Sequence, residues 1–344
     1  MNADMTAHSS FDRWPKAELH LHLEGTISPD TLWALAQANH VALPVGTLAE
    51  LRALFTFESF EHFIKLWMLM CSCLKTAADY ERMVDGFVEE CVRQNIRYVE
   101  AHFTPYNHEL LGFGGRRALD IVTRRLEGAE AAGGPVARLI ADIPSEAAGK
   151  AGPYTAGLLE EETNPLVVAI GLGGPEVGFP RALFAPWFAR ARAAGYEAVA
   201  HAGETEGAPH VRQAVLDLGV RRVQHGIRAV EDEEVLRLLA ERRICCDVAL
   251  TSNECLRVVP AVKDHPVRRM IAAGVPVTLS TDDPPFFGTD LNREYERAHR
   301  ELGFTPPELW ELNLNGLRHA LAETGVRRRL MAEFRAAAEA LGIG

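Results

Sequence analysis

The sequence predicts an α/β fold: a (β/α)₈ TIM barrel with extra helices after the first strand, forming a single domain over residues 1–344. Short apolar, β-branched runs alternate with longer stretches of helical spacing, and eight such pairs are the number in this barrel. A length of 344 residues also suits one barrel. A doubly wound open sheet is the alternative, but no G-x-G-x-x-G motif follows the first apolar run.

The predicted strands are 17–23, 97–103, 137–143, 166–172, 197–202, 222–225, 244–250 and 276–281. Helical segments lie between them, for example "AADYERMVDGFVEECVRQN", "EDEEVLRLLAERR" and "HPVRRMIAAG". Several of these segments end in glycine, as helices often do. The stretch 32–93 is too long for one crossover helix, so we expect additional helices there. No repeat, low-complexity tract or linker divides the chain.

Composition excludes several classes of protein. The net charge is −11, which argues against a nucleic-acid surface or a basic membrane contact. No apolar run reaches the length of a membrane span, and the N-terminus lacks the pattern of a secretory signal. The six cysteines form no C-x-x-C pair. We therefore expect a cytoplasmic protein with reduced cysteines that serve mostly as packing groups.

Four predicted strand ends carry metal-ligand or acid–base side chains. Side chains two residues apart on a strand point to the same side, so the pair in "ELHLHLEG" faces the barrel mouth. A single histidine at such a place is more often an unrelated polar residue at the start of a loop. The combination at four strand ends, on the face where barrel enzymes assemble their active sites, predicts a catalytic centre. Its members are His20, His22, His201, Glu204, His225, Asp282 and Asp283.

Three imidazoles and one carboxylate, from His20, His22, His201 and Asp282, make a ligand set that suits Zn²⁺ or a similar divalent metal. Such a metal lowers the pKa of a bound water to about 7. Glu204 and His225 remain as proton carriers. The fourth strand ends in "AIGLGGPE" without a lysine that could bridge a second metal. The sequence therefore predicts one zinc ion per chain.

These motifs identify a resemblance. The segments "ELHLHLEG", "GLGGPE", "HAGE", "QHG", "TSN" and "STDDP" occur in the order found in the adenosine deaminase family of metal-dependent amidohydrolases. The resemblance implies that His20, His22, His201 and Asp282 are the zinc ligands and that His225 handles the zinc-bound water. It also implies that Glu204 protonates purine N1, Asp283 contacts N7, and Gly174 meets N3 through its backbone N–H. Glu24 takes the place of an acidic residue near the sugar 5′ position.

The implied reaction is hydrolytic deamination at C6 of an adenine nucleoside of the adenosine or deoxyadenosine type. The H-x-E and P-C-x-x-C design of cytidine and polynucleotide deaminases is absent. Aminodeoxyfutalosine, an adenine nucleoside with a benzoate-bearing 5′ extension, is an alternative substrate. Adenine is a third, although its deaminases tend to carry a serine-rich stretch where this chain has "GLGGPE". A catalytically inactive binding or signalling relative is the alternative from another class, but no ligand or proton carrier is missing.

Several features stay open at this level. Residues at 224, 249 and 250 (Gln224, Ala249 and Leu250) depart from the family pattern, and two of them, Gln224 and Leu250, are expected near the pocket mouth. The segment 55–70 is either a helix packed on the barrel or a lid over the substrate. Candidates to meet a substrate carboxylate are Arg52, Lys65 and Arg293. His62, His102, His265 and His319 are expected to be structural or surface residues. The expected partner is a small purine nucleoside, not nucleic acid or a membrane, and oligomeric state is not predicted.

Overall fold

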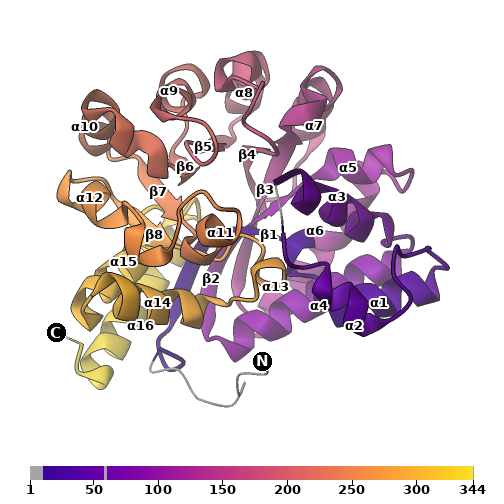
Figure 1. The fold of residues 1–344 in the computed structure, drawn as a ribbon, viewed down its shortest axis with the longest axis horizontal. Coiled ribbons are helices and arrows are strands. Elements are labelled where there is room, and N and C mark those ends of the chain that lie inside the picture. The colour runs from indigo at the N-terminus through magenta and orange to yellow at the C-terminus, as the bar shows by residue number, and fades with distance from the viewer. Residues whose placement is uncertain (1–10, 58–59, 344) are drawn as a thin grey trace.

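The computed structural model describes residues 11–57 and 60–343. Its eight strands form one parallel sheet in sequence order, from β1 to β8. The segment just after β8 bonds to β1 through two backbone hydrogen bonds, from His22 N–H to the Asp282 carbonyl (2.9 Å) and from Asp282 N–H to the His20 carbonyl (3.1 Å). The predicted (β/α)₈ barrel is confirmed (Figure 1).

The strands are short and almost fully buried, as expected when both faces of a parallel sheet are covered. Every residue of β3 is buried. Their bounds are β1 Lys16–His22, β2 Ile96–Phe103, β3 Val136–Pro144, β4 Val167–Gly173, β5 Glu197–Ala202, β6 Arg222–His225, β7 Cys245–Val248 and β8 Val277–Leu279. The predicted last strand was too long, because Glu18 accepts hydrogen bonds from the backbone N–H and the hydroxyl of Thr281.

Four helices lie between β1 and β2, which confirms the predicted insertion. They are α1 Pro29–Ala38, α2 Leu48–Ala53, α3 Phe60–Ser72 and α4 Ala77–Arg93. The later crossovers carry α5 Pro105–Leu110, α6 Gly115–Ala131, α7 Ala148–Glu161, α8 Ala185–Ala193, α9 Ala208–Gln213, α10 Glu233–Arg242, α11 Leu250–Cys255 and α12 Val267–Ala272.

The segment 55–70 both packs on the protein and faces the barrel mouth. Its aromatic rings contact those of α13 (Pro284–Phe287), which follows β8. Phe63 stacks on Phe287 with ring centroids 5.6 Å apart, and Phe57 stacks on Phe286 at 6.1 Å. Other side chains of α3 line the pocket described below. Residues 58 and 59 of this segment lie outside the described residues.

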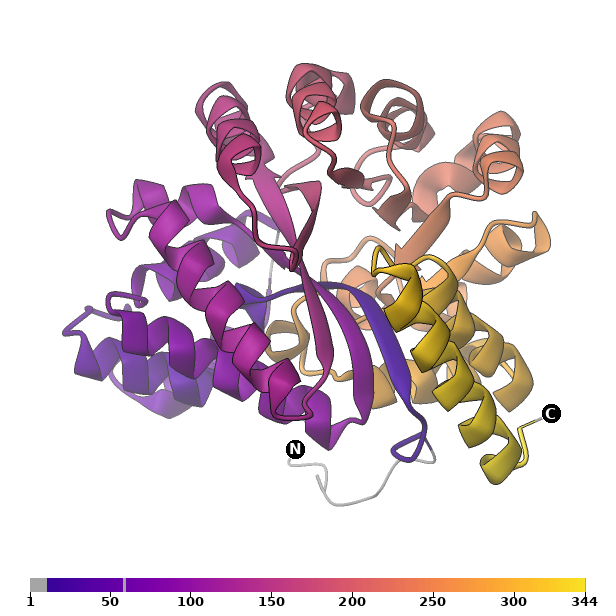
Figure 2. The same cartoon turned by 180° about the vertical axis from the view of Figure 1, so that it is seen from behind.

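Three further helices follow α13 and complete the outer layer: α14 Leu291–Leu302, α15 Pro306–Arg318 and α16 Thr324–Leu341. Figure 2 shows α16 in yellow on the outside of the molecule, and Trp310 of α15 meets Phe334 of α16. Asn313 of α15 holds the start of β1, because its amide oxygen accepts from Ala17 N–H and its NH₂ donates to the Pro15 carbonyl. Within the described residues, no helix combines the length and apolar character that a membrane span needs.

Candidate metal centre and pocket

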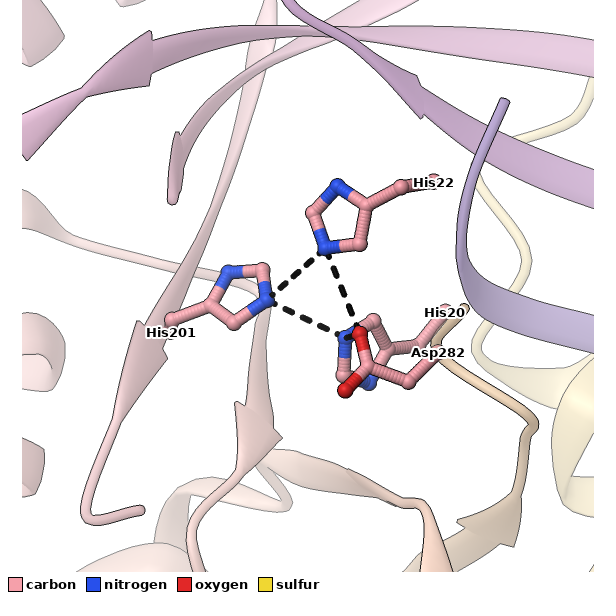
Figure 3. A group of neighbouring side chains, drawn as sticks. All are labelled: His20, His22, His201 and Asp282. Carbon is pink, nitrogen blue, oxygen red and sulfur yellow. Dashed lines mark hydrogen bonds and ion pairs between the residues drawn. The ribbon is translucent and has the colours of Figure 1, made fainter. Parts of the chain in front are cut away.

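Four side chains converge where β1, β5 and β8 end (Figure 3). Nε2 of His201 lies 3.1 Å from Nε2 of His20 and 3.2 Å from Nε2 of His22. One carboxylate oxygen of Asp282 lies 3.3 Å from the same nitrogen of His20 and 3.4 Å from that of His22. Zinc–ligand distances of about 2.0–2.1 Å would set tetrahedral ligands ~3.3–3.4 Å apart, so the spacing fits one ion.

The histidine tautomers support the same conclusion. Nδ1 of His20 donates to the Asp247 carbonyl (3.1 Å), and Nδ1 of His201 donates to the Leu172 carbonyl (2.8 Å). A neutral imidazole has one N–H, so the two Nε2 atoms that face each other both present lone pairs. Two buried lone pairs at hydrogen-bond distance repel each other unless a cation or a proton lies between them. The chemistry of this donor set therefore fits a divalent metal.

The carboxylate of Asp282 is itself held in place. Ser252 donates its hydroxyl to the second oxygen of Asp282 at 2.7 Å. Asp282 has a φ of 66°, a backbone conformation that is unfavourable for residues other than glycine and is often found at functional sites. Although burial alone would raise it, the nearby rings of His20 and His22 hold the pKa of Asp282 well below its ordinary value.

The loop that carries Glu204 is fastened by a carboxylate from the "GLGGPE" motif. Glu176 accepts backbone N–H groups from Gly203, Glu204, Thr205 and Glu206 at 2.7–3.0 Å. One carboxyl oxygen of Glu204 is buried and has no hydrogen-bond partner among the described residues. Burial, and next the carboxylates of Asp282 and Glu176, raise the pKa of Glu204 well above its ordinary value. Glu204 is thus placed to carry a proton near neutral pH.

A chain of hydrogen bonds fixes the tautomer of His225. Val267 N–H donates to Nδ1 of His265 (3.1 Å), so the proton of His265 is on Nε2, which faces the amide oxygen of Asn253 (3.1 Å). The amide NH₂ of Asn253 must then donate to Nδ1 of His225 (3.1 Å). Consequently Nε2 of His225 carries the proton, and it lies 3.6 Å from Glu204. Burial, and next the ring of His20, lower the pKa of His225 to about 3, which keeps the ring neutral.

Asp283 and Gly174 lie in the wall of the same pocket. Burial raises the pKa of Asp283 well above its ordinary value, and Trp67 is its hydrogen-bond partner. A Cβ at Gly25 would lie 1.7 Å from a carboxyl oxygen of Asp283, so the glycine of "HLEG" leaves room for that carboxyl. Gly174 has a φ of +80°, and a Cβ there would lie 2.4 Å from Glu146.

Glu24, by contrast, does not line the pocket. It is completely buried, and one of its oxygens accepts from Thr104 N–H at 2.9 Å and lies 3.2 Å from the ring of His108. Gln224 and Leu250 do not line the pocket either, so the expectation that they shape its mouth is wrong. Both side chains are buried in the barrel, where Gln224 faces Asp247.

The pocket encloses about 620 Å³ of free space, its open mouth included. Acidic and histidine side chains, together with Thr104 and Asn107, form its polar part. The apolar part comes mainly from α3 and the end of α11, namely Phe63, Ile64, Trp67, Met68 and Leu256. Among the described residues, no lysine or arginine lines it.

The three basic residues considered from sequence lie elsewhere. Arg52 pairs with Asp30 (2.7 Å), Lys65 pairs with Glu61 (2.8 Å), and Arg293 donates to the Gly288 carbonyl (2.8 Å). None of them lines the pocket.

Some site residues escaped the sequence analysis. Asp142, at the end of β3, lies 3.7 Å from Nδ1 of His22 and 2.9 Å from Nδ1 of His102. The sequence gives only an indirect sign of Asp142, namely the glycine at position 171 on β4. The structure explains that glycine, because a Cβ there would lie 1.8 Å from the Asp142 carboxylate. His102 and His265, expected to be structural or surface histidines, are both buried and support His22 and His225 respectively.

Comparisons with known proteins agree with this geometry. A family model described as adenosine deaminase matches residues 15–337. The chain is 39% identical to an aminodeoxyfutalosine deaminase of Streptomyces coelicolor, over 95% of this chain and 85% of that protein. It is 36% identical to an adenine deaminase of Bordetella parapertussis, over 90% and 97%. A crystal structure of an amidohydrolase from Burkholderia ambifaria with bound Zn superposes with a TM-score of 0.89 at 28% identity, over 100% and 97%.

Proposed function

The chain belongs to the adenosine deaminase family of metal-dependent aminohydrolases that deaminate purines, and from this premise we propose that it hydrolyses the 6-amino group of an adenine nucleoside of the adenosine or deoxyadenosine type. The products would be ammonia and a 6-oxopurine. The observation that carries the proposal is the placement of Glu204 and His225, both buried, beside the ligand group of His20, His22, His201 and Asp282.

The four ligand residues are proposed to hold one zinc ion. The deaminase family and a Zn-bound structural neighbour support a divalent metal, and three imidazoles with one carboxylate suit zinc. When bound, the metal would supply a water activated for attack on C6. His22 keeps its Nδ1 toward Asp142, which orients Nε2 toward the other ligands.

Glu204 is proposed to protonate N1 of the purine. Attack at C6 disrupts the aromatic ring, and a proton on N1 gives the displaced electrons a place to go. A carboxyl can deliver that proton near neutral pH only if its pKa is raised, as burial does here. The carboxyl oxygen of Glu204 that lacks a partner is available for this contact.

His225 is proposed to donate a hydrogen bond from Nε2–H to the attacking oxygen. Its low pKa and fixed tautomer support a role as a neutral donor. Burial raises the pKa of Asp283, and in its protonated form this carboxyl can donate to N7, which is an acceptor. Gly174, which lines the pocket, is proposed to meet N3 through its backbone N–H.

A second candidate substrate is aminodeoxyfutalosine. The 39% identical relative carries that activity in its name, and the apolar mouth formed by α3 and Leu256 could cover an aromatic 5′ extension. Glu24 does not line the pocket, which leaves it poorly placed to accept a hydrogen bond from a 5′-hydroxyl. Adenine remains a third candidate through the Bordetella relative.

The deciding experiment compares kcat/KM for adenosine, 5′-deoxyadenosine, aminodeoxyfutalosine and adenine by ammonia release. If adenosine is the substrate, its kcat/KM should exceed those of aminodeoxyfutalosine and adenine by more than about tenfold, or ~1.4 kcal/mol. A preference for aminodeoxyfutalosine of more than about tenfold, or ~1.4 kcal/mol, would replace the adenosine proposal with the second candidate. The best turnover with free adenine would overturn both nucleoside proposals.

A further inference from the structure

A second concave pocket lies at the opposite end of the strands from the metal centre. It is formed where β6 and β7 begin and where the C-terminal end of α15 meets the start of α16. Its free space is about 640 Å³, open mouth included. Five arginines line it: Arg221, Arg242, Arg243, Arg318 and Arg327. We refer to it as the arginine pocket.

The charge of this pocket is not balanced by the protein. The chain as a whole has 47 acidic and 36 basic residues and is therefore negatively charged. The five arginines around this concavity make it locally positive, in contrast to the net charge of the protein. Arg221 lies 3.6 Å from Glu197, and Arg318 pairs with Glu311. Arg242, Arg243 and Arg327 make no ion pair with any acidic side chain of the described residues. Like charges held close together repel, which disfavours such a cluster unless an anion offsets it.

One arginine also has an unmet hydrogen-bonding group. Nε of Arg327 is buried and has no acceptor among the described residues. A buried donor without a partner costs about 1–3 kcal/mol, so buried polar groups are nearly always paired. Arg327 lines the arginine pocket, so the structure holds this guanidinium beside the other arginines with one of its donors unpaired.

We propose that the arginine pocket binds a small molecule that carries two or more phosphate groups. The planar guanidinium presents paired N–H donors that match phosphate oxygens, and it keeps its charge at all physiological pH values. Three unpaired cations call for more negative charge than a single phosphate brings. Nucleic acid is disfavoured because these arginines line a single concavity on an acidic protein, whereas a duplex needs an extended basic surface.

Isothermal titration calorimetry at physiological salt tests the proposal. Fructose 1,6-bisphosphate is the first probe, since it has two phosphates and no purine that could enter the catalytic pocket. The test variant combines Arg242→Gln with Arg327→Gln. The control combines Arg328→Gln with Arg329→Gln, which removes the same charge from exposed positions of α16 that do not line the pocket.

We expect saturable binding to the wild-type protein and to the control variant. In the test variant the Kd should rise by at least about tenfold, or ~1.4 kcal/mol. Inorganic phosphate should bind more weakly than the bisphosphate. UTP, which has no purine that could enter the catalytic pocket, shows whether a nucleotide or a sugar phosphate fits better, and either preference supports the proposal. Absence of saturable binding, equal loss in both variants, or tighter binding of duplex RNA would overturn it.

Discussion

The side-chain amide of Asn253 donates to Nδ1 of His225 over 3.1 Å, and this bond decides which ring nitrogen of His225 carries the proton. His265 fixes the direction of this bond, because its Nε2–H donates to the amide oxygen of Asn253 and leaves only the NH₂ group to face His225. The "TSN" motif thus has a double purpose. Ser252 holds the carboxylate of Asp282, and Asn253 holds the neighbouring histidine.

Asn253→Asp should reverse this tautomer, since a carboxylate accepts a hydrogen bond from Nδ1–H where the amide donated one to Nδ1. We expect kcat/KM to fall by at least about 10²-fold, in the range of lost acid–base groups, with metal content unchanged. Nitrogen NMR of the imidazole should show Nε2 without a proton. His265→Gln, which keeps an N–H donor, should lose less activity than His265→Leu. Equal losses in the two His265 variants would contradict the chain of hydrogen bonds.

Glu204→Gln keeps the shape of the side chain but cannot deliver an acidic proton. Turnover should fall by at least about 10²-fold, while folding and metal content stay near those of the wild type. Glu206→Gln, two residues along the same loop and outside the pocket, is the matched control and should keep its activity. His225→Ala should lose activity to a similar degree. A near-wild-type rate in either active-site variant would show that the proposed roles are wrong.

Glu176→Gln tests the loop that positions Glu204. The carboxylate accepts four backbone N–H groups, and an amide oxygen cannot replace it because the NH₂ group would face other donors. We predict a loss of about 1–3 kcal/mol of stability, measured by denaturant unfolding, together with reduced kcat. Glu160→Gln removes an exposed ion pair with Arg190 and should cost less than about 1 kcal/mol. The same effect in both variants would argue against the loop-fastening role.

Metal affinity should rise with pH. Burial acts to lower the pKa of His22, but the carboxylates of Asp283 and Asp282 raise it to about 10 in the metal-free protein. A metal therefore displaces a proton from His22 at any pH below that value, and affinity should increase by about tenfold per pH unit between roughly pH 6.5 and 8.5. Competition with a chelator of known proton affinity measures this slope. A flat profile would mean that His22 is already neutral.

Much of the fold follows from the sequence because the strands are buried on both faces. Their apolar, β-branched runs stand out between amphipathic helices, and only the strand ends were misplaced. The last strand stops at Leu279 because Glu18 takes the hydrogen bonds of Thr281, a contact across 263 positions that no local pattern reveals. Residues 291–341 fold into three helices whose place against the barrel depends on such distant contacts.

The site could be predicted where motif and strand end coincide, as for His20, His22, His201 and Asp282. Asp142 and His265 have no motif of their own, and their importance appears only when distant strands and loops bring them to His22 and His225. Glu24 lies just after β1 in sequence, close to His22, yet the turn after β1 directs it toward Thr104. Side-chain direction after a strand end depends on local backbone geometry, which the sequence does not specify.

The most direct test of a single-metal aminohydrolase is activity as a function of added metal. Protein stripped with a chelator is titrated with zinc, and ammonia release from the best substrate is followed together with bound metal by elemental analysis. If one metal ion per chain supports catalysis, activity should be absent without metal, should rise linearly up to one equivalent of zinc, and should then stay constant. Full activity of the metal-free protein, or a rise that continues to two equivalents, would contradict it.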